Sequence, residues 1–590
     1  MLVVVFFKNI SSGPEIHTIK VSNNKQQYIN AEFTDIVNYN FDVKPILSDK
    51  CYTCHGPDDK ARQADLRLDF VNGISDFLNN DTNHSIIDLN NPQSSEIIKR
   101  IYSNDKGYFM PPPESNLKLS VNEKEILKKW IEQGAKWDSH WSYNKPEYPK
   151  PPETSHSAWI NNEIDNFISK KFDQKGLTPS EPASKEILLR RVFFDIIGLP
   201  PSIEQIDSFL EDNSEDSYEK VVDRLLTSES YGERMASIWM DLSRYGDSHG
   251  YQDDTERVMW PWRDWVIHAY NKNLSYDKFM KWQIAGDMIP NATKEQILAS
   301  GFNRNHKITQ EGGVIDEEYR VEYVADRTIT TSKIMMGLTV ECARCHTHKY
   351  DPITHDEFFS FYSFFNNIDE KGQIPYGVTA PKPNMTVKKE DTENDLSFVK
   401  LPDSLDNVTL MVMKESDKLR KTYVLNRGRY DSPTNEVKPN TPEIVLTFDD
   451  TKYSKNRLGL SQWFFDPENP LTSRVVVNRI WQQFFGVGIV STPDDFGSQG
   501  SKPFNPELLD WLAYTYQNHD KWDTKKFIKR IVMSSTYRQS SKINYENQKI
   551  DADNTYLANY PRQKLTAEMI RDNALASSGM LVNKIGGPSV

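Results

Sequence analysis

The chain has 590 residues, of which 37% are hydrophobic and 12% aromatic, and its net charge is −13. This length is enough for about four domains, and the aromatic content excludes a disordered or collagen-like chain. The acidic excess, without any cluster of basic residues, argues against nucleic acid as a partner, and no run of about 18 apolar residues predicts a transmembrane helix. Residues 2–7 are apolar, but no basic segment precedes them and no small-residue cleavage site follows, so we expect no usable secretory signal in this sequence.

All four cysteines occur in two C-x-x-C-H motifs, at residues 51–55 and 342–346. This pattern is typical of covalent haem c attachment, because cysteines at positions i and i+3 of a helical turn share a face and the next histidine can bind the iron. Two disulfides or a four-cysteine zinc site are the alternatives, but neither explains why histidine follows both pairs. The sequence therefore predicts one haem c at the first motif and a second at the other. The thioether-forming residues are Cys51, Cys54, Cys342 and Cys345, and the iron ligands beside them are His55 and His346.

The N-terminal third begins with a polar arm, residues 1–35, in which we expect little function. An apolar stripe at helical spacing leads into the first motif, and short helices are predicted at residues 94–103 and 124–133. Residues 36–140 should thus form a small all-α domain of the cytochrome c type. Met110 precedes three prolines that stiffen its loop, so we expect its thioether to be the sixth ligand of the first iron, although methionine also fills core gaps.

The rest of the chain is predicted to be mainly α. A proline-rich linker, residues 141–157, precedes a large helical domain, residues 158–370, that contains the second motif. Short strands are expected at residues 408–413, 422–425 and 444–448, within a β-rich insert at 371–450. Residues 451–590 are again helical, and we expect this last domain to be incomplete.

Three groups of motifs resemble a known family. CYTCHGPDDKARQADLRLD, FMPPP and LKKWIEQGA resemble the planctomycete-type cytochrome c domain. The domain of unknown function that follows it in the family is resembled by RRVFFDIIGLPPS, EGGVIDEEYRVEYVADR and LTVECARCHTHKYDPI. The start of a second such domain is resembled by RVVVNRIWQQFFGVGIVSTPDDFGSQG, PELLDWLA and TAEMIRDNALASSGML. The resemblance covers about residues 36–590 and implies an exported, haem-bearing bacterial protein of the periplasm or cell envelope. The family's pattern implies a signal or a lipobox cysteine before the present start and further residues after the present end, so we expect this sequence to be a fragment or to have a misplaced start.

These features favour a multihaem c-type cytochrome that transfers electrons outside the cytoplasm, as the electron-accepting part of an oxidoreductase. A haem-containing protein that binds the envelope or a polysaccharide is a second interpretation. A third is a hydrolase or dehydrogenase with a site near the second motif, built from acidic residues and histidines in YGDSHGYQDD, QEGGVIDEEYR and CHTHKYDP. Such residues are also common at solvated helix ends. The sequence identifies neither catalytic residues nor the redox partner, and it has no phosphate-binding loop, G-x-S-x-G or H-E-x-x-H motif.

The sixth ligand of a haem at the second motif is less well defined, because no Met-Pro loop follows it. His306 lies in a loop before a separate helix, and we expect it to fold over the iron. His249 and an open or water-bound position are the alternatives, and an open position would make this haem the catalytic one. A disulfide between Cys342 and Cys345, with His346 merely packed, is the alternative without haem.

Overall fold

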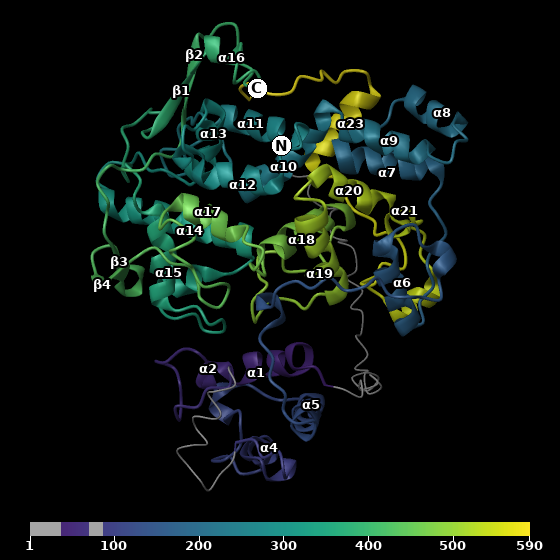
Figure 1. The fold of residues 1–590 in the computed structure, drawn as a ribbon, viewed down its shortest axis with the longest axis vertical. Helices are drawn as coiled ribbons and strands as arrows, with labels where there is room; N and C mark the ends of the chain where they lie inside the picture. The colour runs from purple at the N-terminus through teal and green to yellow at the C-terminus, as the bar shows by residue number, and fades with distance from the viewer. Residues whose placement is uncertain (1–36, 70–85, 590) are drawn as a thin grey trace, which may run out of the picture.

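The computed structural model describes residues 37–69 and 86–589. The whole N-terminal arm, predicted at residues 1–35, therefore lies outside the described residues. Helix accounts for 47% of the structure and strand for 5%, so the prediction of a mainly α fold with a small β insert is confirmed. Figure 1 shows a small lobe, formed by the first helices, below a much larger helical body.

The small lobe has its own hydrophobic core, separate from that of the body. It is built around Val43, Leu47, Tyr52, Leu127 and Trp130, all 2% exposed or less. Apolar residues at helical spacing cause this packing, and a Ser120–Glu123 capping box begins the last helix. Its elements are a π-helical turn (Tyr39–Val43), α1 (Lys44–Lys50), α2 (Tyr52–His55), α4 (Glu96–Tyr102) and α5 (Val121–Glu132).

The large body begins with a series of helices between residues 163 and 362, the last two of which flank the second motif. Among the described residues, its longest helix runs from an acidic first turn to Gly337, whose positive φ of 59° ends it. The helices are α6 (Glu163–Lys175), α7 (Lys185–Ile197), α8 (Ile203–Glu211), α9 (Ser217–Leu226), α10 (Glu229–Leu242), α11 (Trp260–Asn271), α12 (Tyr276–Ala285), α13 (Lys294–Ala299), α14 (Asp316–Met336) and α15 (His355–Tyr362).

The β insert contains two antiparallel hairpins. Its elements are β1 (Asn384–Lys388), α16 (Lys389–Thr392), β2 (Asn407–Met411), β3 (Thr422–Leu425) and β4 (Pro433–Val437). β1 pairs with β2, with Asn384 opposite Met411, and β3 pairs with β4, with Thr422 opposite Val437. The strand predicted at residues 444–448 is wrong, because this segment forms a turn and an irregular stretch that buries Val445 and Phe448.

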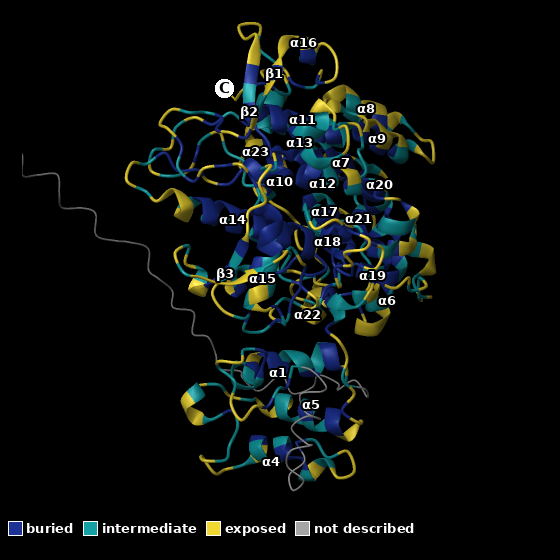
Figure 2. Cartoon of the chain, turned by 60° about the vertical axis from the view of Figure 1, so that its left-hand side comes forward, coloured by how far each residue is buried: buried dark blue, intermediate teal, exposed yellow. Residues whose placement is uncertain are grey.

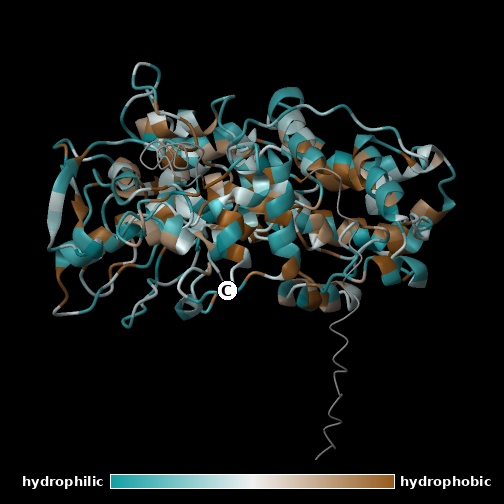
Figure 3. Cartoon of the chain, turned by 90° about the horizontal axis from the view of Figure 1, so that it is seen from below, coloured by the Kyte–Doolittle hydropathy of each residue, from teal (hydrophilic) through white to brown (hydrophobic). Residues whose placement is uncertain are grey.

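The C-terminal helices pack against the earlier ones. They are α17 (Arg457–Phe464), α18 (Thr472–Phe485), α19 (Pro506–Tyr514), α20 (Thr524–Met533), α21 (Ser535–Arg538), α22 (Tyr545–Ile550) and α23 (Ala567–Ser577). One continuous core contains residues from all three predicted segments of the body, from Ile164 through Val424 to Tyr560. Figure 2 shows much of α14 and α18 buried at its centre, and in Figure 3 hydrophobic segments lie mostly inside the body with hydrophilic loops around them.

The small lobe and the body are joined by contacts as well as by the chain. Gln499 Nε2, in the body, donates a hydrogen bond to Ser48 Oγ, in the lobe, at 2.6 Å. The linker residue Trp141 packs on the body, with its ring 5.7 Å from that of Phe496. The predicted linker is also held, because the guanidinium group of Arg474, on α18, donates to the carbonyl of Ser142 at 3.3 Å. The first motif is therefore on the side of the small lobe that faces the body.

Candidate haem-binding site

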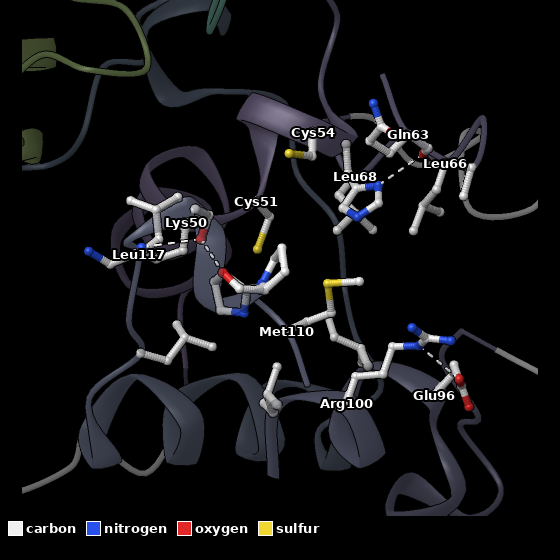
Figure 4. A pocket seen from close by; sticks show the side chains of 18 of the residues that line it. Lys50, Cys51, Cys54, Gln63, Leu66, Leu68, Glu96, Arg100, Met110 and Leu117 are labelled. Atoms are coloured by element: carbon white, nitrogen blue, oxygen red, sulfur yellow. Dashed lines mark hydrogen bonds and ion pairs between the residues drawn. The ribbon is translucent and has the colours of Figure 1, made fainter. Parts of the chain in front are cut away.

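The first motif lies where α1 passes into α2. The amide of Cys51 donates to the carbonyl of Leu47 at 2.8 Å, and the amides of Cys54 and His55 donate to the carbonyl of Cys51 at 3.1 and 2.8 Å. This single helical turn places both thiols on one face. Figure 4 shows the sulfur atoms of Cys51 and Cys54 directed into the same cavity.

That cavity has a volume of about 470 Å³ and a mainly apolar wall. This size lies within the range of pockets that bury a small ligand or cofactor. The apolar lining comes from three parts of the small lobe, namely Leu66, Leu68, Ile86, Ile97, Ile101, Leu117 and Leu119. An apolar enclosure with two thiols in its wall fits a haem, whose macrocycle is hydrophobic and whose vinyl groups react with the thiols.

His55 presents one ring nitrogen to this cavity. Its Nδ1 lies 3.2 Å from the carbonyl oxygen of Gln63, which can only accept, so Nδ1 carries the proton and Nε2 is left for a metal. Burial lowers the pKa of His55, the hydrogen bond to Gln63 opposes this in part, and the charge of Arg100 lowers the pKa further. The imidazole is thus held neutral, as an iron ligand must be.

Met110 lines the same cavity. Its amide donates to the carbonyl of Arg100 at 3.2 Å, which ties the proline loop to α4. Figure 4 shows the thioether of Met110 pointing into the space that the Cys51 thiol also faces. The structure therefore brings together Cys51, Cys54, His55 and Met110 at one cavity. Only Met110 is distant from the other three in the sequence.

Four further residues at this cavity, Gln63, Glu96, Arg100 and Tyr108, had no signal in the sequence. Arg100 Nε donates to Glu96 Oε1 at 2.8 Å, and the Tyr108 hydroxyl donates to the same oxygen at 2.7 Å. The guanidinium group of Arg100 also lies over the Tyr108 ring, 4.4 Å from its centre. An arginine so positioned at the cavity can face the propionate carboxylates of a haem. The sequence also gave no sign of the role of Gln63, because only the folded chain brings its carbonyl group to Nδ1 of His55.

The Cys51 thiol is uncharged in the absence of haem. Burial raises its pKa to about 12, with a smaller contribution from Cys54. None of the four cysteines is paired in a disulfide. Cys51 is partly buried, and a thiol held in its protonated form exchanges slowly because the thiolate is the nucleophile.

The second motif has different surroundings. Cys342 and Cys345 are exposed, and so is His346. The amide of Cys345 donates to the carbonyl of Cys342 at 3.3 Å, and His346 Nδ1 lies 2.7 Å from the carbonyl oxygen of Thr347. The donor set therefore matches that of the first motif, with Nε2 of His346 available. A haem held by these three residues would lie at the surface of the body.

The structure does not support His306 as the distal ligand of an iron at the second motif. It is 1% exposed and both of its ring nitrogens bind protein groups: Nδ1 donates to the Lys307 carbonyl at 2.8 Å, and Nε2 accepts from Arg327 at 2.6 Å. Its ring also stacks on Tyr323, 4.5 Å away. The expectation for His306 is corrected here, because a nitrogen that accepts from arginine has no lone pair for iron. The alternative, His249, is also buried, with Nε2 2.9 Å from the Val378 carbonyl.

The acidic residues of the third interpretation serve loops and helix ends. Asp254 accepts from the amide of Gly250 at 2.6 Å, Glu311 from that of Gln252 at 2.7 Å, and Asp316 from that of Gln373 at 3.0 Å. Asp351 accepts from the amide of Ser498 at 2.7 Å. Across residues 37–69 and 86–589, no group of three or more His, Cys, Asp and Glu side chains is arranged to hold a metal ion. Within the same ranges, no helix is both long and apolar enough to cross a bilayer.

Comparisons with known families agree with this organisation. Residues 51–114 match the planctomycete cytochrome C family, residues 163–370 match a protein of unknown function (DUF1549), and residues 456–590 match another (DUF1553). The order of the three matches is the one that the resemblance predicted. No curated protein and no solved structure matches the chain significantly.

Proposed function

We propose that this chain, which joins a planctomycete-type cytochrome c domain to two domains of unknown function, is an extracytoplasmic c-type cytochrome that transfers electrons. The observation that carries the proposal is the apolar cavity that contains both thiols of the first motif, a neutral His55 and Met110. When bound, the haem supplies a one-electron centre. Location outside the cytoplasm follows from the covalent attachment, which takes place there in proteins of this kind.

The residues of the cavity have distinct tasks. Cys51 and Cys54 anchor the haem, and the Gln63 carbonyl keeps the proton of His55 on Nδ1, away from the iron. Met110 is proposed as the second axial ligand, and thioether ligation raises the reduction potential. The surrounding leucines and isoleucines exclude water, which also favours the less charged, reduced state of the centre.

A second haem at Cys342 and Cys345, with His346, is the finer part of the proposal. Its support is the C-x-x-C-H pattern itself, whose two cysteines and histidine are exposed at the surface of the body. A cavity of about 740 Å³ between the small lobe and the body is lined by Pro57 and Thr347, but the cysteines and the histidine of the second motif do not line it.

The aromatic residues do not favour the polysaccharide interpretation. The largest fully buried side chains of the described residues include five tryptophans of the body, which are Trp262, Trp265, Trp463, Trp481 and Trp511. Sugar binding would require exposed rings, whereas these rings supply core area.

The test is haem counting on exported protein. The full chain is produced with a haem-attachment system in a bacterial periplasm, and haem per chain is measured by pyridine haemochrome absorbance and intact mass. We expect two haems, and one in each of the double variants Cys51→Ser/Cys54→Ser and Cys342→Ser/Cys345→Ser. A wild-type chain without covalent haem refutes the proposal, and one haem that only the first double variant removes restricts it to the small lobe.

A further inference from the structure

The loop between α4 and α5 carries Met110, the side chain proposed above as the second axial ligand. Its first turn is fixed by its own backbone, because the amides of Tyr108 and Phe109 both donate to the carbonyl of Asp105, at 3.0 and 2.8 Å. One backbone hydrogen bond joins the methionine itself to α4, from the amide of Met110 to the carbonyl of Arg100 at 3.2 Å. A single contact of this kind is a modest restraint on a side chain that must reach an iron atom.

Tyr108, two residues before Met110, attaches the loop to the same helix more strongly. Its hydroxyl donates to Glu96 Oε1 at 2.7 Å, and the guanidinium group of Arg100 lies over its ring, 4.4 Å from the centre. A hydrogen bond to an ionised acceptor is about twice as strong as one between neutral groups. The loop is thus held to α4 by the side chain of residue 108 and by the backbone of residue 110.

Glu96 is the residue on which this attachment converges. It is 7% exposed, and its Oε1 also accepts from Nε of Arg100, one turn along α4, at 2.8 Å. Burial raises the pKa of Glu96, but the hydrogen bonds from Tyr108 and Arg100 outweigh this effect and hold the pKa below its usual value. The carboxylate is therefore ionised at neutral pH. One charged group fixes both the tyrosine of the loop and the arginine that stacks on it.

This network belongs to the haem cavity, since Glu96, Arg100, Tyr108 and Met110 all line it. In Figure 4 the hydrogen bond between Arg100 and Glu96 is drawn below Met110, and the two thiols are drawn above it. An arginine and a glutamate four residues apart would by themselves stabilise only α4. The hydroxyl of Tyr108 is what connects the pair to the methionine loop.

We propose that Glu96 is a positioning residue for the axial methionine: through the hydroxyl of Tyr108 it holds the loop so that the Met110 thioether stays at the iron. The inference rests on the proposed function, since it needs a haem whose second axial ligand is Met110. Without this hydrogen bond the loop gains conformations in which the thioether is away from the iron. A competing ligand then binds at the iron more tightly, because the competent arrangement of the loop is less populated.

The test is displacement of the methionine by imidazole in the haem-loaded, ferric full chain, followed by the loss of the far-red absorption band. Tyr108→Phe removes only the hydroxyl oxygen and keeps the ring under Arg100, so it isolates the hydrogen bond. We expect imidazole to bind about tenfold or more tightly in this variant, the size expected for a hydrogen bond to a charged group. Glu96→Gln, which retains an oxygen acceptor for Tyr108, should change the affinity less than Glu96→Ala.

Tyr102→Phe is the matched control, because the Tyr102 hydroxyl also donates to a glutamate, Glu125, at 2.5 Å, and neither of these residues lines the cavity. Its imidazole affinity should equal that of the wild type. Glu96→Ala and Tyr108→Phe should be non-additive, since both remove the same contact. The double variant should therefore bind imidazole about as tightly as Glu96→Ala alone.

The positioning role is overturned if Tyr108→Phe binds imidazole no more tightly than Tyr102→Phe, or if the effects of Glu96→Ala and Tyr108→Phe add. Tyr108→Phe remains decisive if Glu96→Ala does not fold. Haem content and the far-red band of the wild-type chain are recorded on the same samples. A wild type without haem or without the band refutes the ligation by Met110 itself, whereas a wild type with both and an unaffected Tyr108→Phe refutes only the role of Glu96.

Discussion

Replacement of Glu370 by Gln should destabilise the centre of the body, because one carboxylate there compensates two buried guanidinium groups. Both side-chain oxygens of Glu370 lie 2.5 Å from nitrogens of Arg327, and one also accepts from Arg304. The three side chains are 2% exposed or less. Among the described residues, Glu370 is the one acidic residue that contacts both arginines. The variant therefore leaves two cations buried without a counter-ion.

The expected cost follows from these contacts. Breaking a buried ion pair by removing one partner costs about 3–5 kcal/mol, and the two arginines place Glu370 in the upper part of that range. A glutamine oxygen still accepts one hydrogen bond, which recovers about 1 kcal/mol. We therefore expect a loss of about 3–4 kcal/mol, an increase in the opening equilibrium constant on the order of several hundredfold.

Native-state hydrogen exchange measures this loss locally, which matters because a chain of several segments need not unfold in one step. The amides to follow are those of α14, which carries Arg327, and of residues 300–306. Glu546→Gln is the control, since Glu546 pairs with Lys549 on the surface, where both side chains are at least 69% exposed. A loss below about 1 kcal/mol, the size typical of surface pairs, would refute the reasoning.

Four further results are expected. His306→Ala should leave haem content and visible spectra unchanged, and a changed spectrum would restore His306 as a ligand. Burial and nearby arginines hold the pKa of His306 well below its usual value, and the arginines lower the pKa of Glu370 although burial raises it. The unfolded chain therefore takes up protons at a higher pH than the folded chain, and the urea midpoint of unfolding should fall as the pH drops below about 6.5. A midpoint that rises over this range contradicts the reasoning. Met110→Ala should lower the reduction potential in a redox titration and remove the far-red band of methionine-ligated ferric haem, and an unchanged band excludes Met110. Ser120→Ala breaks the capping box of α5 and should cost the small lobe about 1 kcal/mol in thermal unfolding, whereas Ser120→Asp, which can still cap, should cost less.

Local spacing predicted the parts of the site that depend on one helical turn. The i, i+3 cysteines and the following histidine lie within five residues, so their arrangement needs only the hydrogen bonds of α2. Short helices were predictable for the same reason, as with the segment expected at residues 94–103, which forms α4 at Glu96–Tyr102. Met110 is more distant, but its stiff proline loop and the small size of the lobe left few alternatives.

Contacts between distant segments explain the predictions that were wrong. His306 looked available because nothing near it in sequence shows that Arg327 would occupy Nε2. Residues 444–448 have the composition of a strand but meet no neighbouring strand. Their backbone is satisfied differently, since the Leu446 carbonyl accepts from the side chains of Trp463 and Thr441. Composition indicated that these residues are buried, but it could not indicate which groups they would bind.

The two C-x-x-C-H motifs have the same local pattern and opposite surroundings, and this difference bears on how electrons would move. Around Cys51 the chain builds an apolar cavity with ligands on both sides, whereas Cys342 and its neighbours face solvent. Burial restricts solvent access to a redox centre and thereby influences its reduction potential, whereas exposure permits contact with partner molecules. On the proposed function, a haem at Cys51 would be shielded from solvent and a haem at Cys342 would be accessible to partner molecules.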